Sequence, residues 1–354
     1  MNHTGLTEYE LLRQWNTRLR VVLLPHSILL VVYFIVCVLG NMAVIYIYQI
    51  RFHHNTDGRF FMPYLAGMDM LACFVGCATS LLINFNPVLY PSNVLCKVSY
   101  ALCYFFSTSS ALMLSVIAAQ RFLKICRPFK FQMSGRRKGF GIVIIIVVSS
   151  GMSVPAFVTF GISSIRNTSM NITGQYCASI NVNGSNMTSL VYNCTVSAIC
   201  VINMCFLCTL YTRIGNKLRE MRQRRLQRIA TREKWSDADV FTSETEKNSV
   251  NTLDKQRRHT SKNVTEMGNQ VTLMYFIITF AFSVFFIPTF VTILWDIIDV
   301  NPWLTKGDAY VVGFRFSYTV FIINYLINPL VYSLFDSDFR GELQKLIPRF
   351  CRNV

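Results

Sequence analysis

The chain alternates between long apolar stretches and shorter polar ones. Seven stretches reach about 20 residues or more with few charges, which is the length a helix needs to cross roughly 30 Å of hydrocarbon. They lie at Val22–Tyr48, Phe60–Leu82, Val94–Ile125, Phe140–Phe160, Val191–Tyr211, Val271–Trp295 and Tyr310–Tyr332. The pattern predicts an all-α membrane protein, built as a seven-transmembrane helix bundle.

The polar residues divide the chain into parts. Residues 1–21 are predicted to form an extracellular N-terminal tail, residues 22–334 the seven-helix domain, and residues 335–354 a last helix and tail. The longest polar connection, residues 212–268, begins with a dense basic stretch, Arg213–Lys234, that we expect to continue the fifth helix. The rest of this intracellular loop lacks apolar periodicity, so it is predicted to be partly disordered.

An amphipathic segment follows the seventh stretch. Phe335, Phe339 and Leu343 recur at helical spacing among charged residues, which predicts a short eighth helix on the inner membrane surface. Cys351 is a predicted palmitoylation site, because an acyl chain there would give the tail a second anchor. An unmodified thiol is the alternative.

The basic residues predict an orientation. With the N-terminus outside, 27 of the 34 Lys and Arg residues fall on inner segments and 7 on outer ones, as expected because positive residues are retained in the cytoplasm. We therefore expect a multi-pass plasma-membrane protein with a cytoplasmic C-terminus. The net charge of +16 is confined to the short polar segments, which favours contact with anionic membrane lipids over nucleic acid.

N-x-S/T triplets agree with this orientation. The predicted glycosylation sites, all on outer segments, are Asn2, Asn167, Asn171, Asn183 and Asn186. A loop that is merely polar is the alternative, because chance triplets are common.

Asp69 is the only acidic residue inside the seven stretches. A carboxylate at mid-membrane costs several kcal/mol, so its presence favours a functional role over a simple hydrogen-bonded carboxyl. Oxygen and amide groups on other stretches could join it in holding a small hard cation. These candidate partners are Asn41, Ser110, Asn324 and Asn328.

Cys96 and Arg121 lie at opposite membrane faces. They are 25 residues apart, which is about 37 Å along a helix and slightly more than the hydrocarbon thickness. Cys177 lies in an outer loop, where oxidising conditions permit a disulfide with Cys96.

Pro288 and Pro329 are predicted to kink the sixth and seventh helices, either as hinges of a two-state bundle or as static packing features.

The sequence resembles the rhodopsin-like (class A) G-protein-coupled receptors over about residues 22–345. Each motif is weak alone, but all of them in this order are specific. They are Gly40–Asn41, Leu65–Ala66 with Asp69, Cys96 with Arg121, Asn328–Pro329 with Tyr332, and Phe339–Arg340. The resemblance implies a non-enzymatic receptor that binds an extracellular ligand and activates a heterotrimeric G protein, with arrestin and a receptor kinase as further partners.

The resemblance also implies roles for the matched residues. Cys96 and Cys177 would form a disulfide over the ligand pocket. A sodium ion that favours the inactive state would be the only bound cofactor, held by Asp69, Ser110, Asn324 and Asn328. The residues that would rearrange as the sixth helix swings outward are Arg121, Tyr211, Phe282, Phe286, Pro288, Pro329 and Tyr332.

Several positions depart from the family pattern. Gln120 stands where an acidic residue usually restrains Arg121, and Gly268 stands where the sixth helix often supplies another, although Glu266 is close. Weaker restraint of Arg121 predicts raised ligand-independent signalling. A receptor that binds ligand without G-protein coupling is the alternative. Two further departures are Phe286 in place of Trp and Asn203 in place of Pro.

The matched positions also bear on the ligand. Cys103 replaces the Asp that amine receptors use, and Ile322 replaces the Lys that binds retinal in opsins. The predicted pocket consists of Tyr100, Cys103, Tyr104, Ser107, Phe290 and Tyr318. Outer charges that would suit an extended peptide are Lys97, Asp296, Asp299, Lys306, Asp308 and Arg315. A neuropeptide-type ligand is therefore predicted, with a lipid or small polar ligand as the alternative.

Overall fold

Seven helices are long and apolar enough to cross a membrane in the computed structural model, which describes residues 7–51, 60–128, 134–168, 170–180, 187–238, 273–274, 276–299 and 303–352. These spans are Leu24–Ile50, Met62–Phe85, Asn93–Cys126, Gly135–Thr159, Met187–Arg228, Phe276–Ile298 and Asp308–Phe335. The seven-helix fold predicted from the apolar stretches is confirmed.

The described secondary structure is mostly helical. The helices are α1 (Glu8–Val22), α2 (Leu24–Ile45), α3 (Met62–Phe85), α4 (Asn93–Cys126), α5 (Gly135–Ser153), α6 (Ala156–Thr159), α7 (Met187–Ala238), α9 (Asp308–Thr319), α10 (Asn324–Phe335) and α11 (Ser337–Arg352), with a further helix over the sixth span, Phe276–Ile298. The strands β1 (Phe160–Asn167) and β2 (Ile172–Ser179) form an antiparallel hairpin in which Ile162 faces Cys177.

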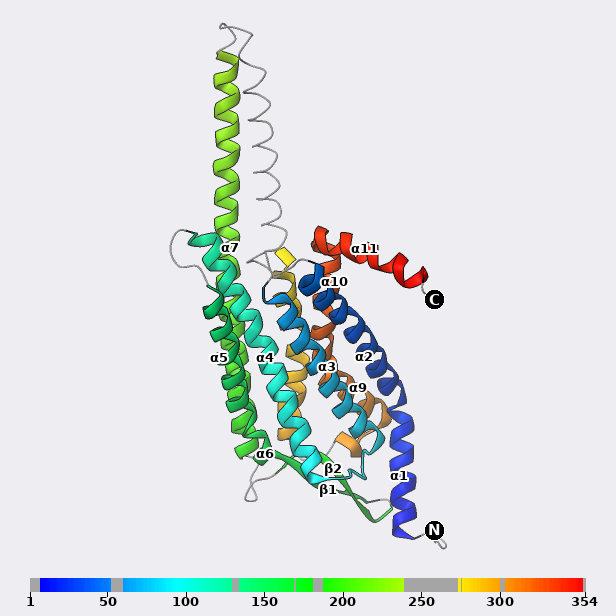
Figure 1. Ribbon diagram of the computed structural model, residues 1–354. Coiled ribbons are helices and arrows are strands. Elements are labelled where there is room, and N and C mark those ends of the chain that lie inside the picture. The colour runs from blue at the N-terminus through cyan, green and yellow to red at the C-terminus, as the bar shows by residue number, and fades with distance from the viewer. Residues whose placement is uncertain are drawn as a thin grey trace.

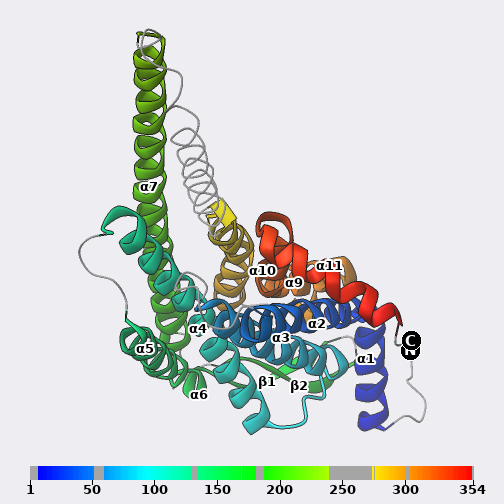
Figure 2. The same cartoon turned by 45° about the horizontal axis from the view of Figure 1, so that its top comes forward.

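The helices form one elongated bundle (Figures 1 and 2). The hairpin and α1 lie at one end, which we call the hairpin end, and α11 lies across the other, the α11 end. Helix α7 continues far beyond the bundle at the α11 end (Figure 1), through the basic stretch Arg213–Lys234, as predicted. The loop was predicted to be disordered from about Ser236, but α7 extends to Ala238. Residues 239–268, which hold the rest of that part of the loop, lie outside the described residues.

The outer surface of the bundle is apolar. Helix α5 leaves Val147 64% exposed, and α7 leaves Ile202 67% exposed, whereas Ile145 of α5 is buried against the neighbouring helices. Exposed apolar side chains of this kind suit hydrocarbon as a solvent, because lipid tails are as apolar as the side chains themselves. The helices meanwhile satisfy their backbone hydrogen bonds internally, which lipid requires.

Much of the predicted N-terminal tail is helical. Thr7 and Glu10 form a capping box at the start of α1, in which the Glu10 carboxylate accepts from the Thr7 amide at 2.7 Å. Trp15 and Leu19 of α1 are buried in the same apolar cluster as the hairpin. Arg20 donates to the carbonyl of Phe85 at the end of α3, at 2.8 and 3.0 Å. Helix α1 is therefore part of the folded hairpin end.

The predicted amphipathic helix is present as α11. It begins at Ser337 because the Asp336 carboxylate accepts from the backbone amides of Asp338 and Phe339, at 3.1 and 3.2 Å. The Phe339 ring is buried and stacks on Tyr48 at 5.7 Å. Cys351 lies in this helix, but its side chain falls outside the described residues, so palmitoylation there stays a prediction.

The seventh span is not one continuous α-helix. A 3₁₀ turn, Val320–Ile323, separates α9 from α10, and Pro329 lies inside α10. Because proline has no amide hydrogen, the Tyr325 carbonyl lacks its usual helical donor. The Asn41 side chain of α2 donates to that carbonyl at 3.0 Å. The Gly40–Asn41 motif therefore has a structural role, because Asn41 replaces the hydrogen bond that Pro329 removes.

Gly40 should be intolerant of a larger side chain. A Cβ atom at this position would lie 3.0 Å from two carbons of Pro329, closer than ordinary packing allows. We expect Gly40→Val to lower the free energy of unfolding by about 1–3 kcal/mol through overpacking. Thermal melting of the purified protein would measure this. Gly67→Val is the matched control, because a Cβ on Gly67 meets nothing within 4 Å; equal losses in the two variants would contradict the explanation.

Candidate functional site

The hairpin covers one end of the bundle. Cys177 of β2 is disulfide-bonded to Cys96 at the start of α4, with Cα atoms 5.7 Å apart, as the sequence predicted. Phe160 of β1 stacks on Tyr100 of α4, with ring centroids 4.0 Å apart. The backbone of Gln175 makes two hydrogen bonds, of 2.8 and 3.0 Å, to the connection between α3 and α4. The cover is therefore attached to the bundle by covalent, aromatic and backbone contacts.

A cavity of about 100 Å³ lies beneath the hairpin, between α3, α4, α7, the sixth span and α9. It is lined by all six predicted pocket residues, Tyr100, Cys103, Tyr104, Ser107, Phe290 and Tyr318. Its walls on α3 and α7 were not predicted, because an apolar helix carries no mark of which face turns inward. These include Thr79, Ser80, Asn193, Val196 and Cys200.

Several polar side chains that line this cavity form hydrogen bonds with other side chains of the protein. The Tyr104 hydroxyl donates to Asn193 of α7 at 2.5 Å. Ser107 and the Tyr325 hydroxyl share a hydrogen bond of 2.8 Å. The rest of the lining is mainly aliphatic and aromatic, so the cavity suits a molecule with a large apolar part.

The sixth span connects the cavity to the α11 end. Phe282 and Phe286 line the cavity and stack with ring centroids 5.8 Å apart. Phe282 also belongs to a large apolar core that includes Tyr211 of α7 and Tyr332 of α10. A ligand that moves the two phenylalanine rings would therefore disturb packing that extends toward the far end of the bundle. Pro288 lies just beyond them on the same helix.

The α11 end is closed. Arg121, Tyr211 and Tyr332 are all buried there. Tyr211 contacts Phe276 of the sixth span, with ring centroids 6.2 Å apart, and Tyr332 contacts Phe339 of α11 at the same distance. Three of the predicted switch residues are thus packed inside the bundle at this end.

Asn203, where the family usually has a proline, joins two helices. It accepts from the Ser115 hydroxyl of α4 at 2.5 Å and donates to the Ala111 carbonyl at 3.4 Å. Gln120, another departure from the family pattern, is buried and precedes Arg121 in the chain. Gly268 and Glu266 lie outside the described residues.

Gln120→Asp should lower ligand-independent signalling. A carboxylate next to Arg121 would add a charge-assisted interaction, worth about 1.5–3 kcal/mol, that holds the guanidinium in the closed arrangement. The resemblance implies coupling to a G protein, so we expect basal nucleotide exchange by a G protein to fall about tenfold in membranes that contain the chain. Gln120→Asn is the uncharged control and should resemble the original chain. Basal exchange that is absent already in the original chain, or equal in both variants, would contradict this prediction.

Asp69 lies at the centre of a buried polar cluster. Its side chain is 0% exposed and accepts from the Ser110 hydroxyl at 2.6 Å and from the Asn328 side-chain amide. Asn324 makes no hydrogen bond to this carboxyl, and Asn41 is bonded to the backbone of Cys37 and Tyr325 instead. The structure thus brings together three of the four predicted sodium-site residues directly.

The donor set fits a small cation. In the described part of the chain, the side-chain oxygens of Asn41, Asn324 and Asn328 are buried and accept no hydrogen bond. Buried polar oxygens without a partner are costly. Together with the Asp69 carboxylate and the Ser110 hydroxyl they are the hard oxygen ligands that such ions prefer.

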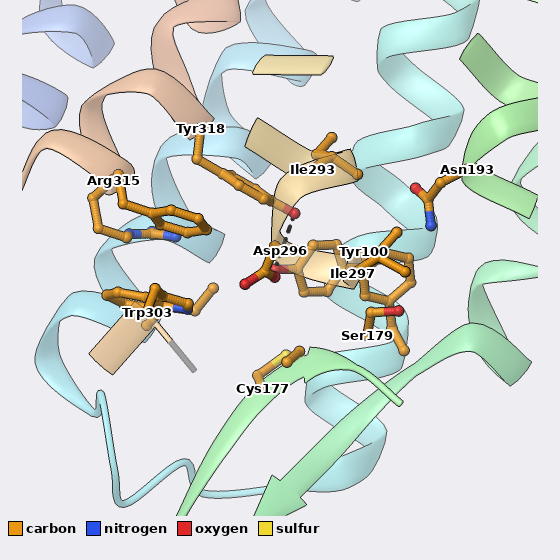
Figure 3. A pocket seen from close by; sticks show the side chains of 14 residues that line it. Tyr100, Cys177, Ser179, Asn193, Ile293, Asp296, Ile297, Trp303, Arg315 and Tyr318 are labelled. Atoms are coloured by element: carbon orange, nitrogen blue, oxygen red, sulfur yellow. Dashed lines mark hydrogen bonds between the residues drawn. The ribbon is translucent and has the colours of Figure 1, made fainter. Parts of the chain in front are cut away.

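Three of the six charges assigned to a peptide ligand form ion pairs within the protein itself. Asp308 forms an ion pair with Arg18 of α1 at 3.1 Å, and Lys306 is paired with Asp299. Asp296 and Arg315 line a small pocket of about 10 Å³ directly under the hairpin (Figure 3). The surface therefore offers less to an extended peptide than the sequence suggested.

Two of the predicted glycosylation sites lie at the tip of the hairpin. Asn167 ends β1, and Asn171 follows in the turn, with φ of 52° and an exposed side chain. Asn2, Asn183 and Asn186 lie outside the described residues. Glycosylation at all five sites stays a prediction.

Comparison with known families identifies the class. The family model for the 7 transmembrane receptors of the rhodopsin family matches residues 40–332, so the chain belongs to this family. It is accordingly a multi-pass membrane receptor and not an enzyme. The match begins at the Gly40–Asn41 motif and ends at Tyr332, so the cavity, the Asp69 cluster and Arg121 all fall within it.

Several known proteins that are similar to this chain are olfactory receptors. The chain is 31% identical to mouse olfactory receptor 5P72 over 135 residues, which cover 37% of this chain and 41% of that receptor. It is 29% identical to mouse olfactory receptor 5P58 over 171 residues (46% and 50%) and 30% identical to human olfactory receptor 5P2 over 134 residues (37% and 38%). The chain thus spans at most half the length of these relatives, and none of the three is a neuropeptide receptor.

Proposed function

We propose that this chain is a plasma-membrane receptor that binds a small, largely apolar molecule in the cavity and activates a heterotrimeric G protein at the α11 end. The cavity carries the proposal: it is lined mainly by apolar and aromatic groups, lies under a disulfide-anchored cover, and ends on the stacked pair Phe282 and Phe286. The naming of the relatives as olfactory receptors supports a small molecule over the peptide that the sequence favoured.

The proposed orientation places the hairpin end outside the cell. The disulfide supports this, because oxidising conditions are found there, and the basic extension of α7 supports a cytoplasmic α11 end. A G protein would bind at the α11 end, and arrestin and a receptor kinase would bind at the same end. Anionic lipid would contact the basic part of α7.

Ligand binding would act through the sixth span. Displacement of Phe286 and Phe282 would loosen the core that holds Tyr211 and Tyr332, and Pro288 would supply the bend, because proline weakens the helix at its own position. Outward movement of this span would uncover Arg121 for the G protein. The change is a shift between two arrangements of one bundle, which requires that the ligand bind the open one more tightly.

The proposed mechanism includes a sodium ion bound at the buried polar cluster around Asp69. Asp69, Ser110, Asn324 and Asn328 would hold it, and its charge would compensate the buried carboxylate between α3, α4 and α10. These residues therefore stabilise the closed arrangement, because the three helices must stay close for their oxygens to converge.

Nucleotide exchange by a purified G protein, added to membranes that contain the full chain, tests the proposal. We expect exchange above that of membranes without the chain, and a further rise with some members of a panel of small aliphatic and aromatic compounds. Cys200→Phe, which fills the cavity, should abolish the rise. Cys205→Phe is the matched control, because Cys205 is exposed on the same helix.

Two outcomes would reject parts of the proposal. Ligand binding without any exchange would favour the receptor that does not couple to a G protein. A response that survives in Cys200→Phe would place the ligand outside the cavity.

A further inference from the structure

Arg315 is a buried cation that forms no ion pair with any described carboxylate. It lies in α9, inside the seventh span, and is 2% exposed. Its Nε and one terminal nitrogen donate to the Asn84 side chain and the Ser80 carbonyl, at 3.2 and 3.3 Å. Among the described residues, no carboxylate lies within ion-pair distance of it. These two bonds use two of the five N–H donors of the guanidinium, so donors remain for another group.

The guanidinium lies where the two cavities meet. Arg315 lines both the small pocket under the hairpin and the larger cavity below it. Its charge lies over the rings of Trp303 and Tyr318, 5.7 and 5.8 Å from their centroids, as Figure 3 shows for the labelled side chains. The aromatic faces lower the cost of burying the charge, but they provide no hydrogen-bond acceptor for the remaining donors.

A chain of hydrogen bonds fixes the orientation of Arg315. The Asn84 amide nitrogen donates to His26 Nδ1 at 2.8 Å, which directs the Asn84 oxygen toward the guanidinium. His26 Nε2 in turn bonds the Thr319 hydroxyl at 2.8 Å, and that hydroxyl donates to the backbone carbonyl of Arg315. All four side chains are buried. These hydrogen bonds hold the Arg315 side chain in one orientation, and such preorganisation is typical of residues in a binding site.

A buried charge without a counter-ion is expensive in a membrane protein and marks a functional position. An arginine with free donors on one side is suited to a carboxylate, whose two oxygens match the planar fork. Among the described residues, Arg315 is the only Lys or Arg that lines either cavity, and the lining of the larger cavity contains no carboxylate. Asp296, across the small pocket, is a carboxylate that would repel the acid.

We propose that Arg315 binds the carboxylate of a small organic acid whose apolar part occupies the cavity. This inference rests on the proposed function in placing the ligand in that cavity, and it adds the chemical class of the ligand. His26 and Asn84 are positioning residues, because they act on the ligand only through Arg315.

A competing explanation for the buried charge of Arg315 is that Asp296 serves as its counter-ion inside the protein. Figure 3 shows the two side chains on separate elements, the sixth span and α9, and they are not within ion-pair distance. Asp296→Asn separates the explanations. It should strengthen acid binding if Asp296 merely repels the ligand, and it should destabilise the receptor without improving binding if Asp296 is the partner of Arg315.

Binding to the purified full chain in lipid nanodiscs tests the proposal, with matched acids and alcohols as probes. The pairs are hexanoate and 1-hexanol, octanoate and 1-octanol, and 3-phenylpropionate and 3-phenyl-1-propanol. Titrations followed by thermal shift should show at least one acid binding about tenfold or more tightly than its alcohol. Arg315→Gln should weaken that acid by about 10- to 100-fold, the effect of losing one charged hydrogen-bonded contact, and leave the alcohol unchanged.

Two further variants make the result decisive. Asn84→Asp places a carboxylate beside the guanidinium and should also weaken the acid at least tenfold, which keeps the test open if Arg315→Gln fails to fold. Arg18→Gln removes an exposed arginine of α1, 64% exposed and paired with Asp308, and should change nothing. The proposal is overturned if no acid binds more tightly than its alcohol, or if Arg315→Gln and Asn84→Asp bind the acid like the original chain.

The readout distinguishes this proposal from the proposed function, because it involves no G protein. Acid binding through Arg315 without nucleotide exchange would support this inference and reject coupling. Exchange that responds to uncharged compounds only, in the original chain and in Arg315→Gln alike, would support coupling and reject the acid.

Discussion

Cys177→Ser should strongly reduce the amount of folded receptor at the cell surface. The bond between Cys96 and Cys177 joins residues 81 positions apart, and loss of a native disulfide of this kind costs about 2–4 kcal/mol. The hairpin would keep its stacking of Phe160 on Tyr100 and its two backbone bonds at Gln175. We therefore expect several-fold less surface protein and lost ligand binding, rather than a chain that cannot insert.

Surface labelling of an N-terminal epitope, together with ligand binding, would measure this effect. Cys194→Ser is the matched control, because Cys194 is an exposed free cysteine on α7. Equal losses in the two variants would show that the result reflects cysteine replacement in general. Full ligand binding by Cys177→Ser would show that the cavity does not need its cover.

Asp69→Ala should destabilise the receptor, and Asp69→Asn should remove its response to sodium. The alanine variant leaves the Ser110 hydroxyl and the Asn328 amide buried without their acceptor, at about 1–3 kcal/mol each. The asparagine variant keeps an oxygen for Ser110 but removes the negative charge that would attract the ion. Because a ligand that binds only the folded form raises its stability, sodium should raise the melting temperature of the original chain alone.

Thermal melting in sodium chloride and in choline chloride of equal concentration would test this prediction. The change of salt at constant ionic strength separates specific binding from screening. A melting temperature that is the same in both salts for the original chain would argue against a cation at Asp69. Equal stabilisation of Asp69→Asn would place the ion elsewhere.

Hydropathy predicted the bundle because lipid imposes a strong constraint on sequence. A spanning helix must be about 20 apolar residues long, so each span is visible without any knowledge of its neighbours. The same reasoning placed Cys96 and Arg121 at opposite ends of α4, and both lie there. The interruption of the seventh span by a 3₁₀ turn was not predicted, because it leaves the apolar character of the segment unchanged.

The pocket was predicted on one side only. The six pocket residues predicted on α4, α9 and the sixth span all line the cavity, whereas its walls on α3 and α7 carried no signal. Asn41 was expected to join the cation site, but its side-chain NH2 group donates to the carbonyl that Pro329 leaves free, and only its oxygen remains for a cation. Such a role depends on two segments 284 residues apart and cannot be read from either.

Arg315 shows the limit of sequence reasoning most clearly. Counted along the chain, it is one of several charges near the outer ends of the spans, and the sequence grouped it with Asp308 and Lys306 as a contact for a peptide. In the structure those two residues form ion pairs near the surface, while Arg315 is buried on the inner side of α9.

The number of spans, their approximate positions and the family were determined by the sequence itself, since solvent and chain length act on each segment independently. Which charges are buried, which are paired and which face a cavity was decided only by the tertiary structure, because these properties depend on neighbours far away in the chain.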